Sequence, residues 1–224
     1  MSSGTAVLVA KYFGLAFSAL LPVVNPLGSA LFILGLVGTE PPNVFRRLAR
    51  RIAINSVLFL LVVELVGSAM LAFFGVSLPV VQLAGGLVLS VVGWQLLNQK
   101  EYQANAKVSS IDPDGDSLAD KVFYPLTFPI TVDPACIVVT LTLAAHASRE
   151  KVVNNVLAHV GILLGIVTVS FSVFLCYTYA PKITQKISPQ TVHGILRVIA
   201  FVLLCIGVQI GWNGLDALLQ NVHK

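Results

Sequence analysis

The sequence contains little charge for its length of 224 residues. Asp, Glu, Lys and Arg make up 11% of the chain, whereas soluble domains carry about 25%. Hydrophobic residues make up 56%, and the mean hydropathy is +0.88. A chain of this size has too much surface to bury so many apolar side chains inside a water-soluble globule. The composition therefore excludes soluble, disordered and collagen-like proteins, and it predicts a protein whose solvent is lipid.

Cysteines and catalytic motifs are also scarce. The three cysteines, Cys136, Cys176 and Cys205, lie within apolar runs and lack metal-ligand spacing, so we predict that they are small buried hydrophobic side chains. The sequence contains no phosphate-binding loop, no HExxH zinc motif and no GxSxG nucleophile motif. We therefore expect no catalytic site, no metal, no cofactor and no ATP-binding domain.

Long apolar runs, in contrast, are abundant. A membrane-spanning helix needs about 20 mainly apolar residues. Six stretches reach that length, at about 6–38, 52–74, 79–98, 123–147, 156–179 and 195–219. Membrane-spanning β-strands are shorter and alternate apolar with polar residues, a pattern that does not fit these runs. We therefore predict an all-α integral membrane protein with six transmembrane helices.

The basic residues lie in short clusters between the apolar runs, and the net charge is +4. We do not expect a nucleic-acid partner, because loop charges that orient a membrane protein explain this pattern better. Ten of the 14 Lys and Arg residues belong to the side that carries segments 39–51, 99–122 and 180–194. Since Lys and Arg are enriched in cytoplasmic loops, we expect that side in the cytoplasm and both termini outside it.

Segment 99–122 is the long polar stretch of the chain, and four aspartates lie between residues 112 and 120. A calcium-binding loop with that spacing needs glycine at its sixth position and glutamate at its twelfth. This chain has Ser117 and Phe123 at those places. We therefore favour a solvated cytoplasmic loop over a calcium site.

Two of the runs share an interruption that indicates an internal repeat. Asn25-Pro26 and Asp133-Pro134 lie deep in apolar sequence, 108 positions apart, and another proline lies three or four residues before each pair. Residues 93–95 and 207–209 also match in part, at an offset of 114. The chain then divides into two three-helix halves, 1–98 and 123–224, and an odd number of spans inverts the second half in the membrane. Inverted repeats with broken helices are typical of transporters; the alternative is that proline is simply tolerated in membrane helices.

Each of the two pairs predicts the start of a new half-helix. Asn and Asp cap a helix by accepting a backbone N–H, and proline is favoured at the next position. We expect the upstream prolines, Pro22 and Pro129, to help end the preceding helical piece. Free N–H groups at a half-helix start can bind a carboxylate, and free carbonyls on the preceding piece can hold a cation or an ammonium group.

The two interruptions make up the candidate substrate site. We assign to it the capping pairs and their neighbours, which are Asn25, Pro26, Gly28, Ser29, Pro129, Thr131, Asp133 and Pro134. A zwitterion fits such a site, because its two charged ends can meet helix N-termini on one side and carbonyls or a carboxylate on the other. A purely structural cap is the alternative for both Asn25 and Asp133. A carboxylate at membrane depth is costly and usually functional, which favours a functional role for Asp133.

Glu64 is the other acidic residue in the middle of an apolar run. Glu64 and Asp133 are our candidates for proton coupling. The alternative for Glu64 is a neutral side chain that is hydrogen-bonded to a neighbouring helix. His159 lies early in the fifth run, and we favour a satisfied histidine over a proton relay.

Other polar and small residues in the runs predict contacts between helices. Side-chain amides that could hydrogen-bond between helices are those of Gln82, Gln95, Gln209 and Asn213. Gly86, Ser90 and Gly93 form a small-residue stripe that predicts close helix packing.

The assembled motifs resemble those of the MarC family of bacterial inner-membrane proteins, also called the neutral amino acid transporter family. The resemblance rests on LLPVVNPLGSALFILGLVG at 20–38, LPVVQLAGGLVLSVVGWQLL at 78–97, PLTFPI at 125–130 and GVQIGWNGL at 207–215. It implies a six-span bundle of two inverted three-span repeats, and movement of small neutral amino acids by at least some members. The functional positions that the resemblance implies are Asn25, Pro26, Gly28, Pro129 and Pro134.

The second interruption departs from the family pattern, which usually reads Gly-Pro-Gly. Here it reads Asp133-Pro134-Ala135. The added negative charge weakens an anion site at that helix end and favours a cation, a proton or an ammonium group.

These observations favour a secondary transporter of small neutral amino acids or similar zwitterions in the bacterial inner membrane. Export, proton coupling and a homo-oligomeric state stay open. One alternative is a passive channel in which the interruptions line a pore. Another is an intramembrane enzyme or assembly factor that uses Glu64, Asp133 and His159, although the sequence has no nucleophile–base–orienter pattern.

Overall fold

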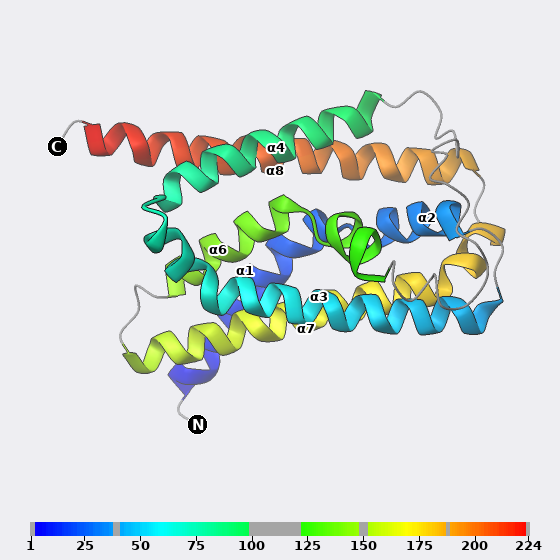
Figure 1. Cartoon of the computed structure of the whole chain (residues 1–224), viewed down its shortest axis with the longest axis horizontal. Helices are drawn as coiled ribbons and strands as arrows, with labels where there is room; N and C mark the ends of the chain where they lie inside the picture. The colour runs from blue at the N-terminus through cyan, green and yellow to red at the C-terminus, as the bar shows by residue number, and fades with distance from the viewer. Residues whose placement is uncertain (1–2, 38–40, 99–121, 148–151, 187–188, 223–224) are drawn as a thin grey trace.

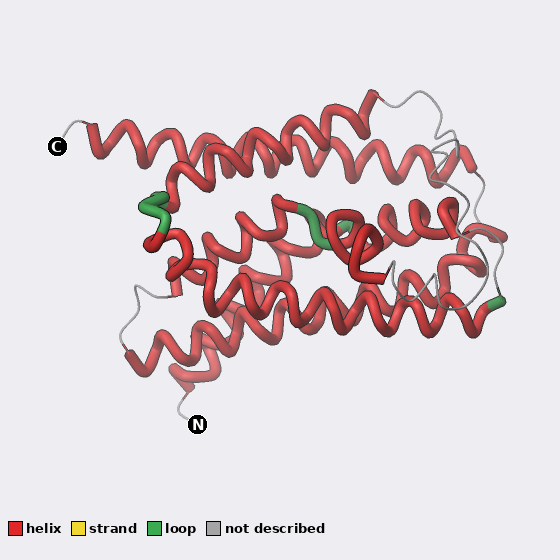
Figure 2. Tube along the Cα trace, viewed as in Figure 1, coloured by secondary structure: helices red, strands yellow, loops and turns green. Residues whose placement is uncertain are grey.

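The computed structural model describes residues 3–37, 41–98, 122–147, 152–186 and 189–222, and every element in these ranges is helical (Figures 1 and 2). In chain order the elements are α1 (Ser3–Val24), α2 (Pro26–Val37), α3 (Pro42–Phe73), α4 (Leu78–Asn98), η1 (Val122–Thr131), α6 (Pro134–Ala147), α7 (Val152–Lys186) and α8 (Pro189–Val222). The all-α prediction is therefore confirmed for the described residues. Loop 99–122 lies outside them except for Val122, the first residue of η1.

Several helices extend beyond the apolar runs that predicted them. The run expected at 52–74 belongs to α3, which already begins at Pro42 and includes four arginines before residue 52. Backbone hydrogen bonding continues into this polar segment because a helix does not need an apolar side chain at every position. Proline at the first helical position suits the start of α3, since its missing N–H has no partner there in any case.

The helices form two groups in Figure 1. In one group, α4 and α8 run side by side in opposite directions. The other group contains α1, α2, α3, η1, α6 and α7. Within it, α7 packs against α1, α2 and α3, while α3 packs against η1 and α6. Both interrupted segments therefore lie in the same group, and α7 contacts both α2 and α6.

The α4–α8 contact depends on glycine. A Cβ added to Gly86 would lie 2.2 Å from the backbone nitrogen of Gly211 and 2.6 Å from the carbonyl oxygen of Gly207. A Cβ added to Gly93 would lie 2.7 Å from the backbone nitrogen of Leu204. Side chains at these places would push the two backbones apart, so the predicted small-residue stripe is a close helix–helix interface.

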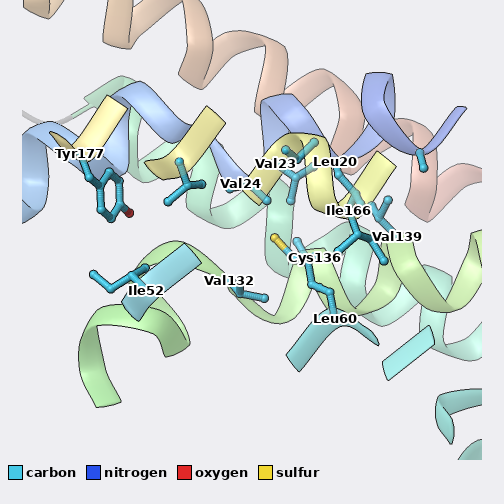
Figure 3. Packing of buried hydrophobic residues seen from close by; sticks show 14 of the residues in the cluster. Leu20, Val23, Val24, Ile52, Leu60, Val132, Cys136, Val139, Ile166 and Tyr177 are labelled. Atoms are coloured by element: carbon cyan, nitrogen blue, oxygen red, sulfur yellow. The ribbon is translucent and has the colours of Figure 1, made fainter. Parts of the chain in front are cut away.

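The core is a cluster of apolar side chains, most of which come from α1, α3, α6 and α7 (Figure 3). Leu20, Ile52, Leu60 and Ile166 are at most 1% exposed. Large apolar side chains also cover the outside, such as Phe73, which is 82% exposed. An apolar interior together with an apolar exterior is expected of a protein surrounded by lipid.

The prediction of buried cysteines is only partly correct. Cys136 is buried and Cys176 is half-buried, but Cys205 is exposed. Cys205 lies on α8 among exposed apolar residues such as Phe201 and Val202. An apolar run alone does not distinguish a core-facing position from an outward-facing one, because both faces of a membrane helix are apolar.

Four helical stretches of the described chain are long and apolar enough to cross a membrane: Gly4–Leu34, Leu78–Gln95, Asn154–Lys182 and Arg197–Gln220. The pair η1 and α6 passes the same test as one unit bent by 69°, which raises the number to five. The remaining predicted span, 52–74, is not among them. The protein is therefore a multi-span helical membrane protein, and its described residues contain four or five spans by this measure.

Candidate functional site

The first interruption is a single residue, Asn25, between α1 and α2. Its backbone is left-handed, with φ of +45°, a conformation that asparagine tolerates better than most residues. Its N–H donates to the carbonyl of Leu21, at 3.0 Å, and continues the α1 pattern. Its side-chain Oδ1 accepts the N–H of Gly28, at 3.1 Å, and caps α2. One residue thus ends one helix and starts the next.

Glycine at position 28 makes room for this cap. A Cβ added there would lie 2.2 Å from Nδ2 and 2.8 Å from Cγ of Asn25. The Asn25 side chain therefore lies directly over the Gly28 backbone. The next residue, Ser29, is buried and donates its hydroxyl proton to the Asn25 carbonyl, at 2.9 Å.

The second interruption is longer and less regular. Residues Tyr124 and Phe128 inside η1 have extended backbone angles, and the chain then bends by 69° into α6. Asp133 caps α6 with Oδ1, which accepts the N–H of Cys136, at 2.9 Å. The Asp133 carboxylate also interacts with the backbone N–H of Ala135. The first-turn N–H groups of α6 therefore already face a carboxylate that belongs to the chain.

Both helix starts were predicted at the correct residue, since α2 begins at Pro26 and α6 at Pro134. Pro22 does not itself end α1, which continues through it and ends two residues later at Val24. A proline inside a helix removes the hydrogen bond to the carbonyl four residues earlier, and its ring clashes with that carbonyl, which weakens the helix there. Pro129 lies two residues before the end of η1, and the residue before it, Phe128, has extended backbone angles, as is favoured before a proline.

The structure brings some of the candidate site residues together and separates others. Pro26 and Ser29 are buried at the first interruption, and Thr131 is buried at the second. Pro129 and Pro134 are exposed. The two interruptions themselves are neighbours, because α1 packs against α6 and α2 packs against η1.

Tyr177 on α7 is a site residue that the sequence did not reveal. It is 2% exposed, and its hydroxyl lies 2.7 Å from Oγ1 of Thr131. Tyr177 therefore joins α7 to the second interruption. It stands in an apolar run without any proline or charge that would single it out, and only its buried position gives it this role.

Glu64 and His159 form another polar contact between helices. Glu64 on α3 is 2% exposed, and its Oε1 contacts Nδ1 of His159 on α7. Glu64 therefore has a hydrogen-bonding partner on a neighbouring helix, as expected if it is a neutral, structurally bonded side chain. His159 is partly exposed, with 25% of its side-chain surface accessible, so the pair lies between the interior and the outside.

The predicted amide contacts are realised in different ways. Gln82 on α4 donates to the hydroxyl of Thr142 on α6, at 3.3 Å, and so joins the two groups of helices. Gln209 instead donates to Asn213 one turn later on the same helix, at 2.8 Å. In the described parts of the chain, no group of three or more His, Cys, Asp or Glu side chains could hold a metal ion.

These features define a class of protein: a multi-span helical membrane protein in which two interrupted helices meet in the interior. The chain belongs to the MarC family of integral membrane proteins, whose family model matches residues 10–219. The resemblance predicted from the motifs is thereby confirmed.

The chain is also similar over nearly its whole length to curated relatives. It is 26% identical over 216 residues to an inner membrane protein MarC of Salmonella typhimurium. The same identity holds for the proteins of that name from Salmonella arizonae and Escherichia coli. Each alignment covers 95% of this chain and 98% of the relative. No solved structure matches the chain.

Proposed function

We propose that this protein is a secondary transporter of small neutral amino acids or similar small zwitterions in the bacterial inner membrane. The observation that carries the proposal is the meeting of two interrupted helices in the interior, where α1 packs against α6 and α2 against η1. Interrupted helices at membrane depth are tolerated where they line a cavity or a binding site. The membrane assignment agrees with the relatives, which are named as inner membrane proteins.

We also propose that the chain has six spans in two inverted repeats, 1–98 and 123–224. In such a repeat α1 corresponds to η1, α2 to α6, α3 to α7 and α4 to α8. The packing supports this, because the contact of α2 with α7 in one half has its counterpart in the contact of α6 with α3. The contact of α1 with α7 likewise has its counterpart in the contact of η1 with α3. The α4–α8 and α3–α7 contacts each join two corresponding helices.

The sixth span in this proposal is the second part of α3. Large apolar side chains of α3 are exposed at helical spacing, as lipid-facing residues would be. They are Ile54, Leu58, Val62, Leu65, Met70 and Phe73. The arginines at positions 46, 47, 50 and 51 are also exposed, at the end of the molecule opposite both termini (Figure 1). This placement supports both termini outside the cytoplasm.

The two interruptions favour opposite ends of a zwitterion. The α2 start has a neutral cap and no acidic residue in its first turn, so it offers the positive end of a helix dipole to a carboxylate. The α6 start is covered by the Asp133 carboxylate. A ligand would therefore place its carboxylate towards Asn25 and its ammonium group towards Asp133.

Proton coupling would use Glu64 or Asp133, the acidic residues of the interior. The Glu64–His159 contact supports Glu64, because a carboxyl and an imidazole can share and exchange a proton. Movement of solute in this scheme requires no catalysis and no cofactor.

The test is solute flux into liposomes that contain the purified protein. We expect saturable, counterflow-competent uptake of alanine, glycine or serine, and an effect of a pH gradient that Glu64→Gln removes if Glu64 carries the proton. Unitary conductance steps without saturation would indicate a channel instead. Folded protein that moves none of these solutes would contradict the proposal.

A further inference from the structure

The beginning of α3 has one buried face and one face of arginines. Phe45, Leu48, Ala49 and Ile52 recur at helical spacing and are at most 3% exposed. The positions between them carry four arginines, and the side chains of all four are exposed. They are Arg46, Arg47, Arg50 and Arg51. Because the opposite face of this segment packs into the protein, the guanidinium groups lie on the outside of the bundle.

The arginines continue a row of exposed residues along α3. From Arg51 the row passes through Ile54 and Leu58 and reaches Phe73, with exposed residues three or four positions apart. Arg51 and Phe73 are 22 positions apart in α3, which corresponds to about 33 Å along a helix axis. The hydrocarbon of a bilayer is about 30 Å thick. With the second part of α3 as the proposed sixth span, the arginines therefore lie at the depth of the lipid headgroups.

The neighbouring helix α7 indicates a membrane boundary at the same end. α7 packs against α3 and finishes at the end of the bundle where α3 begins (Figure 1). Its own exposed row passes Phe171 and Leu175 and then reaches Tyr179 and Lys182. Nζ of Lys182 lies 5.9 Å from the centre of the Tyr179 ring. Tyrosine is enriched at the membrane–water interface, and lysine extends its charge towards it. Both helices therefore meet the headgroup layer here.

The four arginines lack a matching negative charge within the described chain. None of them forms an ion pair with a carboxylate that the structure describes, and the first turn of α3 has no acidic residue. Arg46 and Arg50 are four positions apart, as are Arg47 and Arg51, and like charges at that spacing repel each other. An anion held between the members of a pair would relieve this repulsion. Guanidinium groups bind phosphate oxygens through paired hydrogen bonds.

We propose that Arg46, Arg47, Arg50 and Arg51 bind the phosphate group of an anionic phospholipid. The acyl chains of this lipid lie along the exposed apolar row of α3, which begins directly beside the arginines, and this continuity favours a lipid over a soluble anion. Basic residues anywhere in a loop are enough to orient a membrane protein, whereas two arginine pairs on one outward face at headgroup depth fit a bound phosphate. The lipid belongs to the cytoplasmic leaflet in the proposed orientation of the chain.

Native mass spectrometry of the purified full-length protein in neutral detergent measures the Kd of each added lipid. The probes are phosphatidylglycerol and phosphatidylcholine with the same acyl chains, because the phosphate of the second is balanced by its own ammonium group. We expect phosphatidylglycerol to bind roughly ten- to thirtyfold more tightly. Detergent micelles have no sides and no solute gradient, so the measurement depends neither on the orientation of the chain nor on transport.

Two double variants test the arginines directly. Arg47→Gln with Arg51→Gln should remove most of the preference for phosphatidylglycerol, since each basic residue beside an anionic lipid contributes about fivefold to binding. Arg47→Lys with Arg51→Lys keeps the charge but loses the paired hydrogen bonds, so we expect a smaller rise in Kd, of about three- to fivefold. The lysine variant carries the test if the glutamine variant does not fold.

The matched control removes the same charge elsewhere. Lys11→Gln with Arg197→Gln changes exposed residues of α1 and α8, and we expect it to leave the Kd of phosphatidylglycerol unchanged. An equal loss of binding in this control would overturn the proposal, because it would show general charge attraction instead of a site. Equal binding of the two lipids by the parent would also overturn it. Displacement of the lipid by an excess of inorganic phosphate would replace the lipid site with a site for soluble anions.

Discussion

The two helix interruptions occupy corresponding places in the chain but are made from different chemistry. At the first, one neutral residue in a left-handed conformation ends α1 and caps α2. At the second, the backbone bends by 69° after an irregular η1, and the cap is a carboxylate. The difference shows that capping a half-helix needs only an oxygen acceptor. A negative charge at a helix start is also favoured by the helix dipole, and we propose that the charge of Asp133 serves the solute in addition.

The largest expected effect comes from removing that charge while keeping the cap. Asparagine caps helices about as well as aspartate, so Asp133→Asn should preserve the fold. We expect solute flux to fall by about ten- to a hundredfold, the effect of losing one charged hydrogen-bonding partner. The matched control is Asp216→Asn, which alters an exposed carboxylate near the end of α8 that accepts from Gln220. Normal solute flux in Asp133→Asn would show that Asp133 serves only as a helix cap.

A smaller effect on stability should distinguish the backbones of the two interruptions. Asn25→Ala removes a cap and also places alanine in the left-handed region, which together should lower the free energy of unfolding by about 2 kcal/mol. Asp133→Ala removes a cap without a positive φ, so we expect about 1 kcal/mol. Unfolding in mixed micelles measures both.

Asn25→Gly allows the left-handed backbone conformation without strain, so it should recover most of the free energy of unfolding that Asn25→Ala loses. If Asn25→Ala and Asp133→Ala are equally destabilising, the left-handed conformation of Asn25 contributes nothing and the two interruptions are energetically alike.

The smallest effect is expected at the third position after each cap. At the second interruption this position is Cys136, which carries a buried side chain, whereas at the first it is Gly28. Gly28→Ala should displace the Asn25 side chain and cost about 1 kcal/mol, the value of one cap. In the Asn25→Ala background the same change should have little effect, because the cap is already gone. Gly14→Ala on α1, where an added Cβ meets nothing within 4 Å, is the control.

The sequence was most informative where the local chemistry is strong. Asn-Pro and Asp-Pro predicted the starts of α2 and α6 at the correct residues, since capping and the proline at the next position act over a few residues. The bounds of α3, α7 and α8 were less accurate, because helices continue beyond the apolar runs. Hydropathy indicates which residues prefer lipid, but it does not indicate where the backbone hydrogen bonding of a helix ends.

The polar partners could not be predicted in the same way. Glu64 and His159 are 95 positions apart, and Thr131 and Tyr177 are 46 apart. Nothing in an apolar run indicates which face of a helix meets which neighbour, and that choice decided both contacts. The outward position of Cys205 was missed for the same reason.

Composition and local chemistry alone determined that this is a helical membrane protein with two interrupted helices, because lipid solvation and helix capping depend on residues close together in the chain. The tertiary structure decided which helices meet, and thereby placed the Tyr177 hydroxyl beside Thr131. Such contacts arise from packing among several helices at once, so they follow from the shape of the whole bundle rather than from any single segment.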